Sequence, residues 1–530
     1  MPRQYRYFCL FFSVLITLVL AAPIHAAERI SLYYGPLGRS FTLTALETFA
    51  ETGKLDGTLK FLLSRFSPER RSQIQTILKS PFPVEARMFD RFAYTSSGER
   101  LLQEVGEIIQ SPSRQNGMRG VRSAMTLAAG SPAGVSVLSF LQQFPTDMRI
   151  DVRRLLGLVQ RVSTILTATK TAVAQLNQQT QQAAVPKTIS NNELDLRKPG
   201  NFVYQKQVLT FYDAERDRAF AADFYWPETS SEEATLPVIV MSNGLGAGRD
   251  RFDEIAPHLA SYGFAVVAPD HPGSDRQRLR EFYGGLHREN FDASEYLDRP
   301  KDITFVLNQL EQINQTELGH RLDLQRVGIF GYSFGGSTAL SLAGAEIDFD
   351  YLEQDCKTET SLVNISLLYQ CRALELPRET VSLKDERIQA AFLFVPFGKS
   401  LFGEQGMAKA NIPIFWEVTD LDVLTPLAVE QLPAFAALTT PDKYLAITQG
   451  LPHARVTYDA IGQLIGSTTP WETLKAIAHN YQNALSAAFF KTYVAQESQY
   501  SAYLQPAYAV ALTQEPYHLS LVQTLNLPNQ

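Results

Sequence analysis

Six short apolar runs, separated by helical segments, constrain the fold of this chain more than any other feature. Continuous apolar runs of this length are typical of strands that are buried on both faces of a sheet. Their alternation with helices predicts an α/β fold, with a mostly parallel sheet flanked by helices. Functional side chains are then expected at the carboxyl ends of the strands. The runs span residues 236–241, 264–268, 326–330, 390–395, 413–418 and 444–447.

The chain has 530 residues, which is more than one hydrophobic core usually serves and predicts two domains. Residues 27–165 have helical periodicity and no cluster of reactive side chains, so we expect an N-terminal all-α domain there. Residues 166–199 are rich in glutamine and are interpreted as a helix tail running into a linker. The α/β domain is expected at 200–495, followed by a C-terminal tail at 496–530.

The chain begins with a basic segment, followed by the apolar run 8–20 and then by small residues. Ile24 and Ala26 fit the −3 and −1 positions of a signal-peptidase site. We therefore predict a signal peptide at 1–26 and a mature protein that is periplasmic or extracellular. The alternative is an uncleaved membrane anchor, although the run is short for a membrane span.

Net charge and cysteine content limit the partners and the cofactors that this chain can be expected to bind. A net charge of −7 argues against nucleic acid as a partner, since that requires a basic face. Cys9 lies in the predicted leader, which leaves Cys356 and Cys371 in the mature chain. In an oxidising compartment these two are predicted to form a disulfide, with buried free thiols as the alternative. No cysteine and histidine residues have zinc-ligand spacing, so no metal is predicted.

Ser333 follows the predicted strand 326–330, within the sequence Gly-Tyr-Ser-Phe-Gly at 331–335. This is the G-x-S-x-G pattern of a nucleophile elbow, a sharp strand-to-helix turn that exposes the serine. Larger side chains at the glycine positions would collide with neighbouring elements. Because a predicted strand precedes the pattern and a predicted helix follows it, Ser333 is the expected nucleophile.

A serine nucleophile needs a base, and two of the eight histidines follow predicted strands. His453 follows the run 444–447, and His271 follows the run 264–268. Sites with this elbow have the chain order serine, acid, histidine. This order favours His453, because His271 precedes Ser333.

The acid is expected after the run 413–418, where Asp420 and Asp422 lie. Asp422 precedes Pro426 by four residues, the usual spacing of the acid turn, and is predicted to orient His453 and stabilise its imidazolium. Asp420 is the alternative, expected to cap the turn.

The tetrahedral intermediate of acyl transfer carries a negative oxygen that needs preorganised N–H donors. One is expected from the backbone of Phe334, directly after the nucleophile. The other is expected from Leu245, in the glycine-rich loop 242–249 that follows the first apolar run.

Together these features resemble the α/β-hydrolase superfamily, and within it the platelet-activating-factor acetylhydrolase-like branch, over residues 202–491. The most specific segments are 242–249, Ser-Asn-Gly-Leu-Gly-Ala-Gly-Arg, and 259–268, although Asn243 stands where the branch has histidine. The resemblance implies a serine esterase acting on short or oxidised acyl chains of phospholipids. The animal members carry the acid after the strand that corresponds to 390–395, where this chain has no carboxylate.

Two further segments are interpreted through this resemblance. Residues 346–386, between the elbow helix and the next strand, are an insertion that holds both cysteines and looks like a lid. The N-terminal residues, beginning with Ile30, resemble a helical domain of unknown function that precedes bacterial secreted α/β-hydrolases. This domain is a candidate for docking to a membrane surface or to another protein.

The expected function is therefore that of an exported serine hydrolase that cleaves lipid or short-acyl carboxylic esters through an acyl-enzyme, without metal or cofactor. One alternative is a peptidase or polyester-type hydrolase that uses the same three residues. The other is a non-catalytic binding or scaffold protein in which the site is vestigial.

Overall fold

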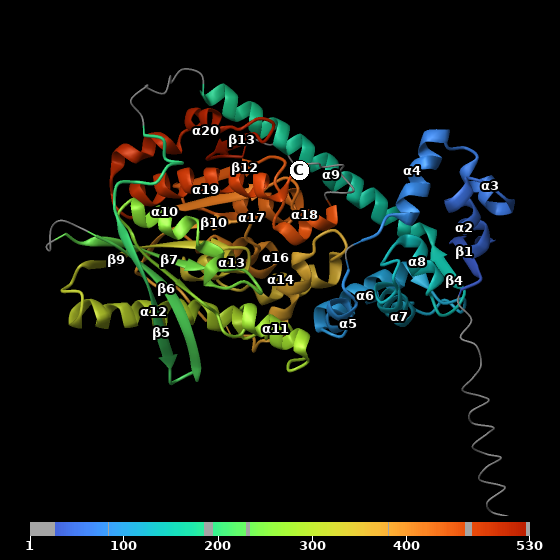
Figure 1. The fold of residues 1–530 in the computed structure, drawn as a ribbon, viewed down its shortest axis with the longest axis horizontal. Coiled ribbons are helices and arrows are strands. Elements are labelled where there is room, and N and C mark those ends of the chain that lie inside the picture. Colours follow the sequence, from blue (N-terminus) through green and yellow to red (C-terminus); the bar gives the residue numbers. More distant parts are fainter. Residues whose placement is uncertain are drawn as a thin grey trace, which may run out of the picture. The chain divides into compact units, whose positions relative to one another are not determined.

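The computed structural model describes residues 27–82, 84–184, 194–228, 234–379, 381–461 and 469–525 (Figure 1). Two compact units can be distinguished. The N-terminal unit comprises Met1–Ala93 and Leu102–Gly157, and the larger unit comprises Tyr94–Leu101 and Leu158–Gln530. The predicted signal peptide lies outside the described residues. None of the described helices combines the length and the apolar character needed to cross a membrane.

The N-terminal unit contains a four-stranded sheet, so the prediction of an all-α domain is wrong. The strand order is β2-β1-β4-β3, with β1 antiparallel to β2 and parallel to β4. A tight turn with Gly35 at φ 60° connects β1 to β2. Helical periodicity missed this sheet because its strands are short and β4 comes from the far end of the unit. The strands are β1 (Arg29–Tyr34), β2 (Leu37–Thr42), β3 (Ile109–Gln110) and β4 (Met148–Asp151).

Short helices pack against one another and this sheet around Phe49 and Phe144, which are almost completely buried. Thr42 caps α2 by accepting a hydrogen bond from the amide of Ala45, as threonine commonly does at a helix start. The helices are α2 (Leu43–Thr52), α3 (Gly57–Leu63), α4 (Pro68–Lys79), α5 (Ala86–Ala93), α6 (Ser96–Ile108), α7 (Met118–Ala129) and α8 (Val137–Gln142).

Helix α9 (Val152–Ala184) is continuous through much of the segment that was expected to be a linker. Residues 166–184 are helical because the unbranched glutamine side chains lose little rotamer freedom in a helix. Val173 and Leu176 of this helix are buried in the core of the larger unit. Within the predicted linker, only residues 185–193 lie outside the described part of the chain.

The larger unit is built on a nine-stranded sheet with the order β13-β12-β11-β10-β9-β7-β8-β6-β5. Strands β8, β7, β9, β10, β11 and β12 run parallel, whereas β5, β6 and β13 add antiparallel edges. The six predicted apolar runs are the six parallel strands. The strands are β5 (Tyr204–Asp213), β6 (Arg218–Pro227), β7 (Leu236–Ser242), β8 (Ala265–Pro269), β9 (Leu322–Tyr332), β10 (Ile388–Phe394), β11 (Ile414–Thr419), β12 (Lys443–Thr448) and β13 (Leu519–Val522).

Alternate side chains of each strand enter cores on opposite faces of the sheet. Val238 and Val240 pack with α12 and α13, while Ile239 and Met241 pack with α10 and α19. Figure 1 shows the sheet between these two groups of helices. The helices after α9 are α10 (Ile255–Ser261), α11 (Arg276–Gly284), α12 (Glu295–Thr316), α13 (Phe334–Leu342), α14 (Phe349–Thr358), α15 (Ser366–Gln370), α16 (Lys399–Met407), α17 (Leu432–Ala437), α18 (Arg455–Ile461), α19 (Trp471–Tyr493) and α20 (Pro506–Leu512), with short helical turns η1 (Arg249–Phe252), η2 (Cys371–Glu375), η3 (Leu427–Gln431) and η4 (Ser498–Leu504).

The segment expected to be a C-terminal tail is part of the fold. Strand β13 pairs antiparallel with β12 at the edge of the sheet, and α20 packs in the same core as α19. Leu504, Leu512 and Leu519 are almost completely buried. The larger unit therefore extends beyond residue 495, and β13 supports the strand that precedes His453.

Candidate active site

Ser333 lies at a sharp turn between β9 and α13, as the G-x-S-x-G pattern predicts. Its backbone has φ 54° and ψ −115°, a conformation that non-glycine residues rarely adopt and that is found at functional sites. The glycines that follow are needed for packing. A Cβ atom at Gly335 would collide with the carbonyl of Ser242, and one at Gly336 would lie 2.5 Å from Cβ of Pro396. The turn places Ser333 at the carboxyl end of the central strand.

The structure brings together Ser333, His453 and Asp422, although they lie in three separate loops. His453 Nε2 is 3.2 Å from Ser333 Oγ, and His453 Nδ1 is 2.6 Å from Asp422 Oδ2. A carboxylate only accepts hydrogen bonds, so Nδ1 carries the hydrogen and Nε2 is free to accept the serine proton. The side chains of His453 and Asp422 are almost completely buried. This geometry suits a serine activated by a general base.

Asp422 and Asp420 have different roles in the acid turn. Asp422 accepts hydrogen bonds from the amides of Leu424 and Thr425 and from the hydroxyl of Thr425. Burial opposes its ionisation, but the charge and hydrogen bond of His453, with those donors, hold the pKa of Asp422 below its ordinary value. Asp420 instead accepts from the amide of Gly450, 2.7 Å away, and burial raises its pKa. Asp420 thus holds the loop that carries His453.

The two predicted oxyanion donors line the same cavity as Ser333 and His453. This cavity has a volume of about 170 Å³, and Leu245 and Phe334 are among its walls. Phe334 is the first residue of α13, where amide hydrogens have no partner within the helix and the helix dipole favours negative charge. The cavity therefore combines a serine, its base and a region suited to an oxyanion.

The rest of the cavity wall is mainly apolar and was not predicted from the sequence. Tyr369 and Ser366 come from the insertion 346–386, and Leu424 comes from the acid turn. Phe291 and Phe397 complete an aromatic wall, with the Phe334 ring centroid 5.4 Å from each. No local sequence pattern marks these residues, because they converge from separate segments.

Comparison with protein families agrees with this geometry. Residues 237–357 match the family model described as alpha/beta hydrolase fold. The chain has the α/β-hydrolase fold. Residues 26–151 match a second model, described as alpha/beta hydrolase of unknown function (DUF1400), so the N-terminal unit is similar to a segment found in hydrolases. The likeness to the platelet-activating-factor acetylhydrolase-like branch remains a prediction.

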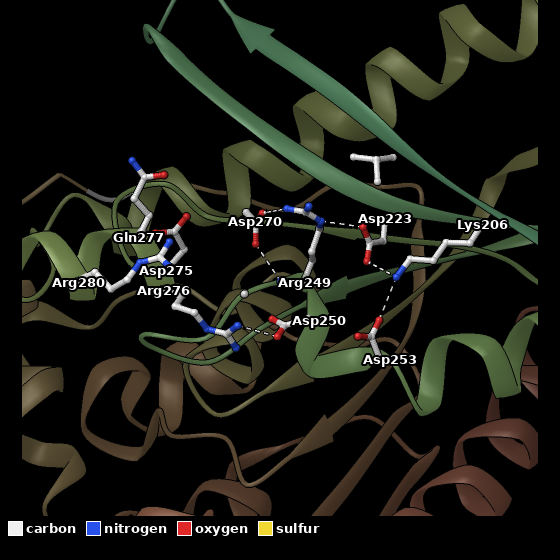
Figure 2. A pocket seen from close by; sticks show the side chains of 12 residues that line it. Lys206, Asp223, Arg249, Asp250, Asp253, Asp270, Asp275, Arg276, Gln277 and Arg280 are labelled. Carbon is white, nitrogen blue, oxygen red and sulfur yellow. Dashed lines mark hydrogen bonds and ion pairs between the residues drawn. The ribbon is translucent and has the colours of Figure 1, made fainter.

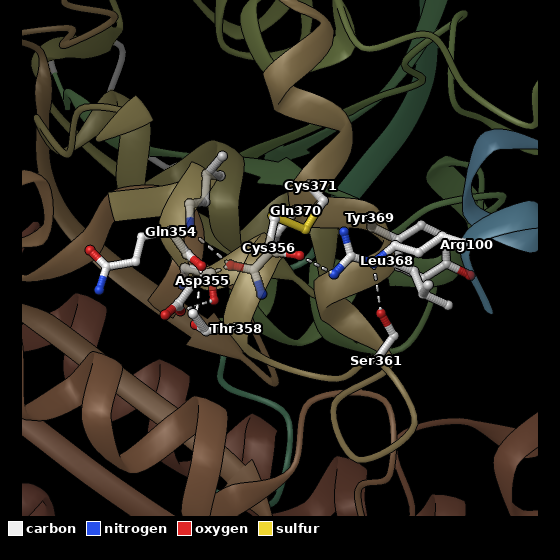
Figure 3. Close-up of a disulfide and its surroundings, with 12 residues drawn as sticks. Arg100, Gln354, Asp355, Cys356, Thr358, Ser361, Leu368, Tyr369, Gln370 and Cys371 are labelled. Carbon is white, nitrogen blue, oxygen red and sulfur yellow. Dashed lines mark hydrogen bonds between the residues drawn. A yellow bond between two sulfur atoms is a disulfide. The ribbon is translucent and has the colours of Figure 1, made fainter. Parts of the chain in front are cut away.

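The disulfide predicted from the sequence is confirmed. Cys356 in α14 is bonded to Cys371 in η2, with a Cα–Cα distance of 5.9 Å (Figure 3). Arg100 of α6 donates hydrogen bonds to the carbonyl of Cys356 (2.6 Å) and to Ser361 Oγ (3.1 Å). Tyr369, two residues before Cys371, lines the cavity. The disulfide and Arg100 therefore hold the insertion that forms one wall of the candidate site.

A second cavity, of about 490 Å³, is lined by the far end of the glycine-rich loop and by charged side chains (Figure 2). Arg249 donates to Asp223 (2.7 Å) and, through both its backbone amide and its guanidinium, to Asp270. Lys206 bridges Asp223 and Asp253. These ion pairs anchor the Arg249 end of the loop that carries Leu245.

His271, the alternative base, does not contact Ser333. It is fully buried, and its ring lies between Ser242 and Asp302. Sequence reasoning missed its neighbour Arg299, although the charged sequence Glu-Tyr-Leu-Asp-Arg-Pro-Lys-Asp at 295–302 was a signal for a buried ionic cluster. Within the described part of the chain, no group of three His, Cys, Asp or Glu side chains could hold a metal ion.

Proposed function

We propose that this protein is an exported serine hydrolase that cleaves carboxylic esters with a short acyl chain. The observation that carries the proposal is the contact chain from Ser333 Oγ through His453 to Asp422, which lies at the wall of an apolar cavity. Serine, imidazole and carboxylate in this relation form the machinery of acyl transfer. The leader sequence and the disulfide support export.

The reaction proceeds in two halves. Ser333 Oγ attacks the ester carbonyl while His453 Nε2 takes its proton, and the carbonyl oxygen gains negative charge between the amides of Leu245 and Phe334. The bond to the alcohol then breaks, and the His453 imidazolium gives its proton to the leaving oxygen. A water molecule repeats the sequence on the acyl-enzyme and releases the acid. Asp422 keeps the His453 ring oriented and stabilises its cationic form throughout.

Cavity size favours a short acyl group. Pockets for small-molecule ligands usually measure roughly 300–1,000 Å³, whereas this cavity measures about 170 Å³. Its aromatic wall suits an apolar chain, and the described residues that line it include no Lys, Arg, Asp or Glu to bind a charged one. A lipid with a short acyl group, or a small soluble ester, fits these properties.

Hydrolysis of p-nitrophenyl esters of graded chain length tests the proposal. We expect turnover to be highest for the shortest acyl chains and to fall by about 10⁴-fold or more in Ser333→Ala. Ser341→Ala is the matched control, because Ser341 lies in the same helix α13 but not at the cavity. Ser333→Ala with wild-type turnover would refute the proposal.

A further inference from the structure

A second array of serine, histidine and aspartate lies beneath the glycine-rich loop. Ser242 Oγ is 3.0 Å from His271 Nε2, and His271 Nδ1 is 3.0 Å from Asp302 Oδ2. All three residues are 0 % exposed, so no substrate reaches them. Any role of the array must therefore be exerted through the neighbouring residues that it contacts, and not through direct contact with a ligand.

The protonation state of His271 determines which groups of this array donate hydrogen bonds and which accept them. Burial, together with the charge of Arg299, lowers the pKa of His271 to about 4, so the ring is neutral at neutral pH. Asp302 accepts from Nδ1–H, which leaves Nε2 to accept the hydroxyl proton of Ser242. The oxygen of Ser242 then faces Arg299 as an acceptor, with Arg299 Nη2 3.4 Å away.

Arg299 connects the glycine-rich loop to Ser274 and to helix α13. Its Nη2 donates to the carbonyl of Asn243, its Nη1 to Ser274 Oγ (2.7 Å), and its Nε to Thr338 Oγ1 (3.1 Å). Asn243 lies in the glycine-rich loop, directly after β7, whereas Thr338 lies in α13, the helix that starts after the nucleophile. A planar guanidinium holds several acceptors in a fixed arrangement, which a lysine ammonium cannot reproduce.

These contacts flank Leu245 and reach the side chain of Phe334. Leu245 lies between Asn243, whose carbonyl binds Arg299, and Gly246, whose amide donates to the carbonyl of Ser274 (2.7 Å). The guanidinium carbon of Arg299 is 4.6 Å from the ring centroid of Phe334. Arg299 thus contacts both the loop that carries Leu245 and the side chain of Phe334.

Carboxylates around Arg299 balance its buried charge. Glu295 and Asp302 are both almost completely buried, and Arg218 bridges them at 3.0 and 2.8 Å. Ser274 Oγ, which accepts from Arg299, donates to Glu295 Oε2 at 2.6 Å. Ser274 therefore connects Arg299 to this carboxylate through two hydrogen bonds. A buried polar network whose members are paired in this way is rigid, because losing any one partner leaves a desolvated polar group.

We propose that Arg299 is a positioning residue that, with the buried Ser242–His271–Asp302 array, sets the spacing of the Leu245 and Phe334 amides that receive the oxyanion. This inference rests on the proposed function, since an oxyanion forms only if Ser333 attacks a carbonyl. Substitutions that remove a hydrogen bond of this network should therefore weaken binding of the transition state more than binding of the ester.

The test compares Arg299→Lys and Ser242→Ala with Arg387→Lys in the full chain. Arg387 is the matched control, because it also joins several acceptors, on Asp385, Thr304 and Glu311, but precedes the amino end of β10. For each protein we would measure kcat and KM with p-nitrophenyl acetate, the inhibition constant of a trifluoromethyl ketone, and the melting temperature. The ketone adds to the serine and carries an oxyanion.

We expect Arg299→Lys to lower kcat by about 100-fold and Ser242→Ala by about 10-fold, with KM changed by less than about 3-fold. The affinity for the ketone should fall by the same factors, and Arg387→Lys should keep the wild-type values of all three constants. Folded Arg299→Lys with kcat within about 3-fold of wild type would overturn the inference. If Arg299→Lys does not fold, an unchanged kcat and ketone affinity in Ser242→Ala overturn it instead. Wild-type protein that cleaves no ester would overturn the proposed function and this inference with it.

Discussion

The Nδ1 atom of His453 lies 2.6 Å from the Oδ2 atom of Asp422, and Asp420, two residues earlier, contacts the backbone of Gly450 instead. The two aspartates follow the same strand, yet only one can orient the base. This division of roles leads to a direct comparison between two variants.

Asp422→Asn should lower kcat by about 10⁴-fold, because an amide favours the wrong tautomer of His453 and leaves its imidazolium unstabilised. Asp420→Asn should stay within about 3-fold of wild type, since the amide oxygen can still accept from Gly450. Steady-state kinetics with p-nitrophenyl acetate measure both. Equal losses in the two variants would mean that Asp422 has been assigned wrongly.

The cavity wall should determine the preferred acyl length. Removing the ring in Tyr369→Ala enlarges the cavity, so the ratio of kcat/KM for an octanoyl ester to that for an acetyl ester should rise by about 10-fold or more, given about 0.8 kcal/mol for each buried methylene. Tyr351→Ala is the control, because Tyr351 lies in the same insertion but does not line the cavity. An unchanged ratio in Tyr369→Ala would contradict the assignment of this wall to the acyl group.

The disulfide should stabilise the larger unit. Closing a loop with a sequence separation of 15 residues contributes about 3 kcal/mol in the chain-entropy treatment. We expect the double variant Cys356→Ser, Cys371→Ser to lose roughly this free energy of unfolding in urea, and reductant to weaken only the wild-type protein. Equal stability of the wild type with and without reductant would argue against a stabilising bond.

The buried His258 should make stability depend on pH. Burial lowers its pKa from 6.5 to about 4, and the hydrogen bonds to the backbone of Leu196 and Asn483 offset this effect only in part. Below pH 6.5 His258 is therefore protonated in the unfolded chain, whereas in the folded chain it stays neutral down to about pH 4. The free energy of unfolding therefore decreases as the pH falls from 6.5 to about 4.

Between pH 7 and pH 5, this effect is about 2 kcal/mol, or 1.36 kcal/mol for each pH unit below 6.5. We expect the wild-type protein to lose about this much more free energy of unfolding than His258→Gln over the same range, whatever the other groups contribute. Urea unfolding at the two pH values measures the difference. The same pH dependence in both proteins would show that His258 is not held neutral.

The sheet and the candidate site were predictable because each depended on a local pattern. Short apolar runs identified the six parallel strands, and Ser333, Asp422 and His453 each follow one of them in the expected chain order. Parallel strands bring their carboxyl ends to one edge, so residues far apart in sequence had to converge there.

Other features depended on long-range pairing, which leaves little trace in a sequence. Strand β13 fills the edge next to β12 although it comes from the expected tail, and β4 joins β1 across most of the N-terminal unit. Arg299 lies in a helix, and only the packing of that helix beneath the glycine-rich loop brings its guanidinium to Asn243. The periodicity of apolar residues along the sequence does not predict such a contact.

The most direct measurement of the central claim is covalent labelling by a fluorophosphonate, followed by mass spectrometry of the intact protein and of its peptides. Wild-type protein should gain one phosphonyl group per chain, on the peptide that contains Ser333. Labelling should be lost in Ser333→Ala and slowed strongly in His453→Ala. A folded wild-type protein that gains no label, or gains it on another residue, would contradict the assignment of Ser333 as the nucleophile.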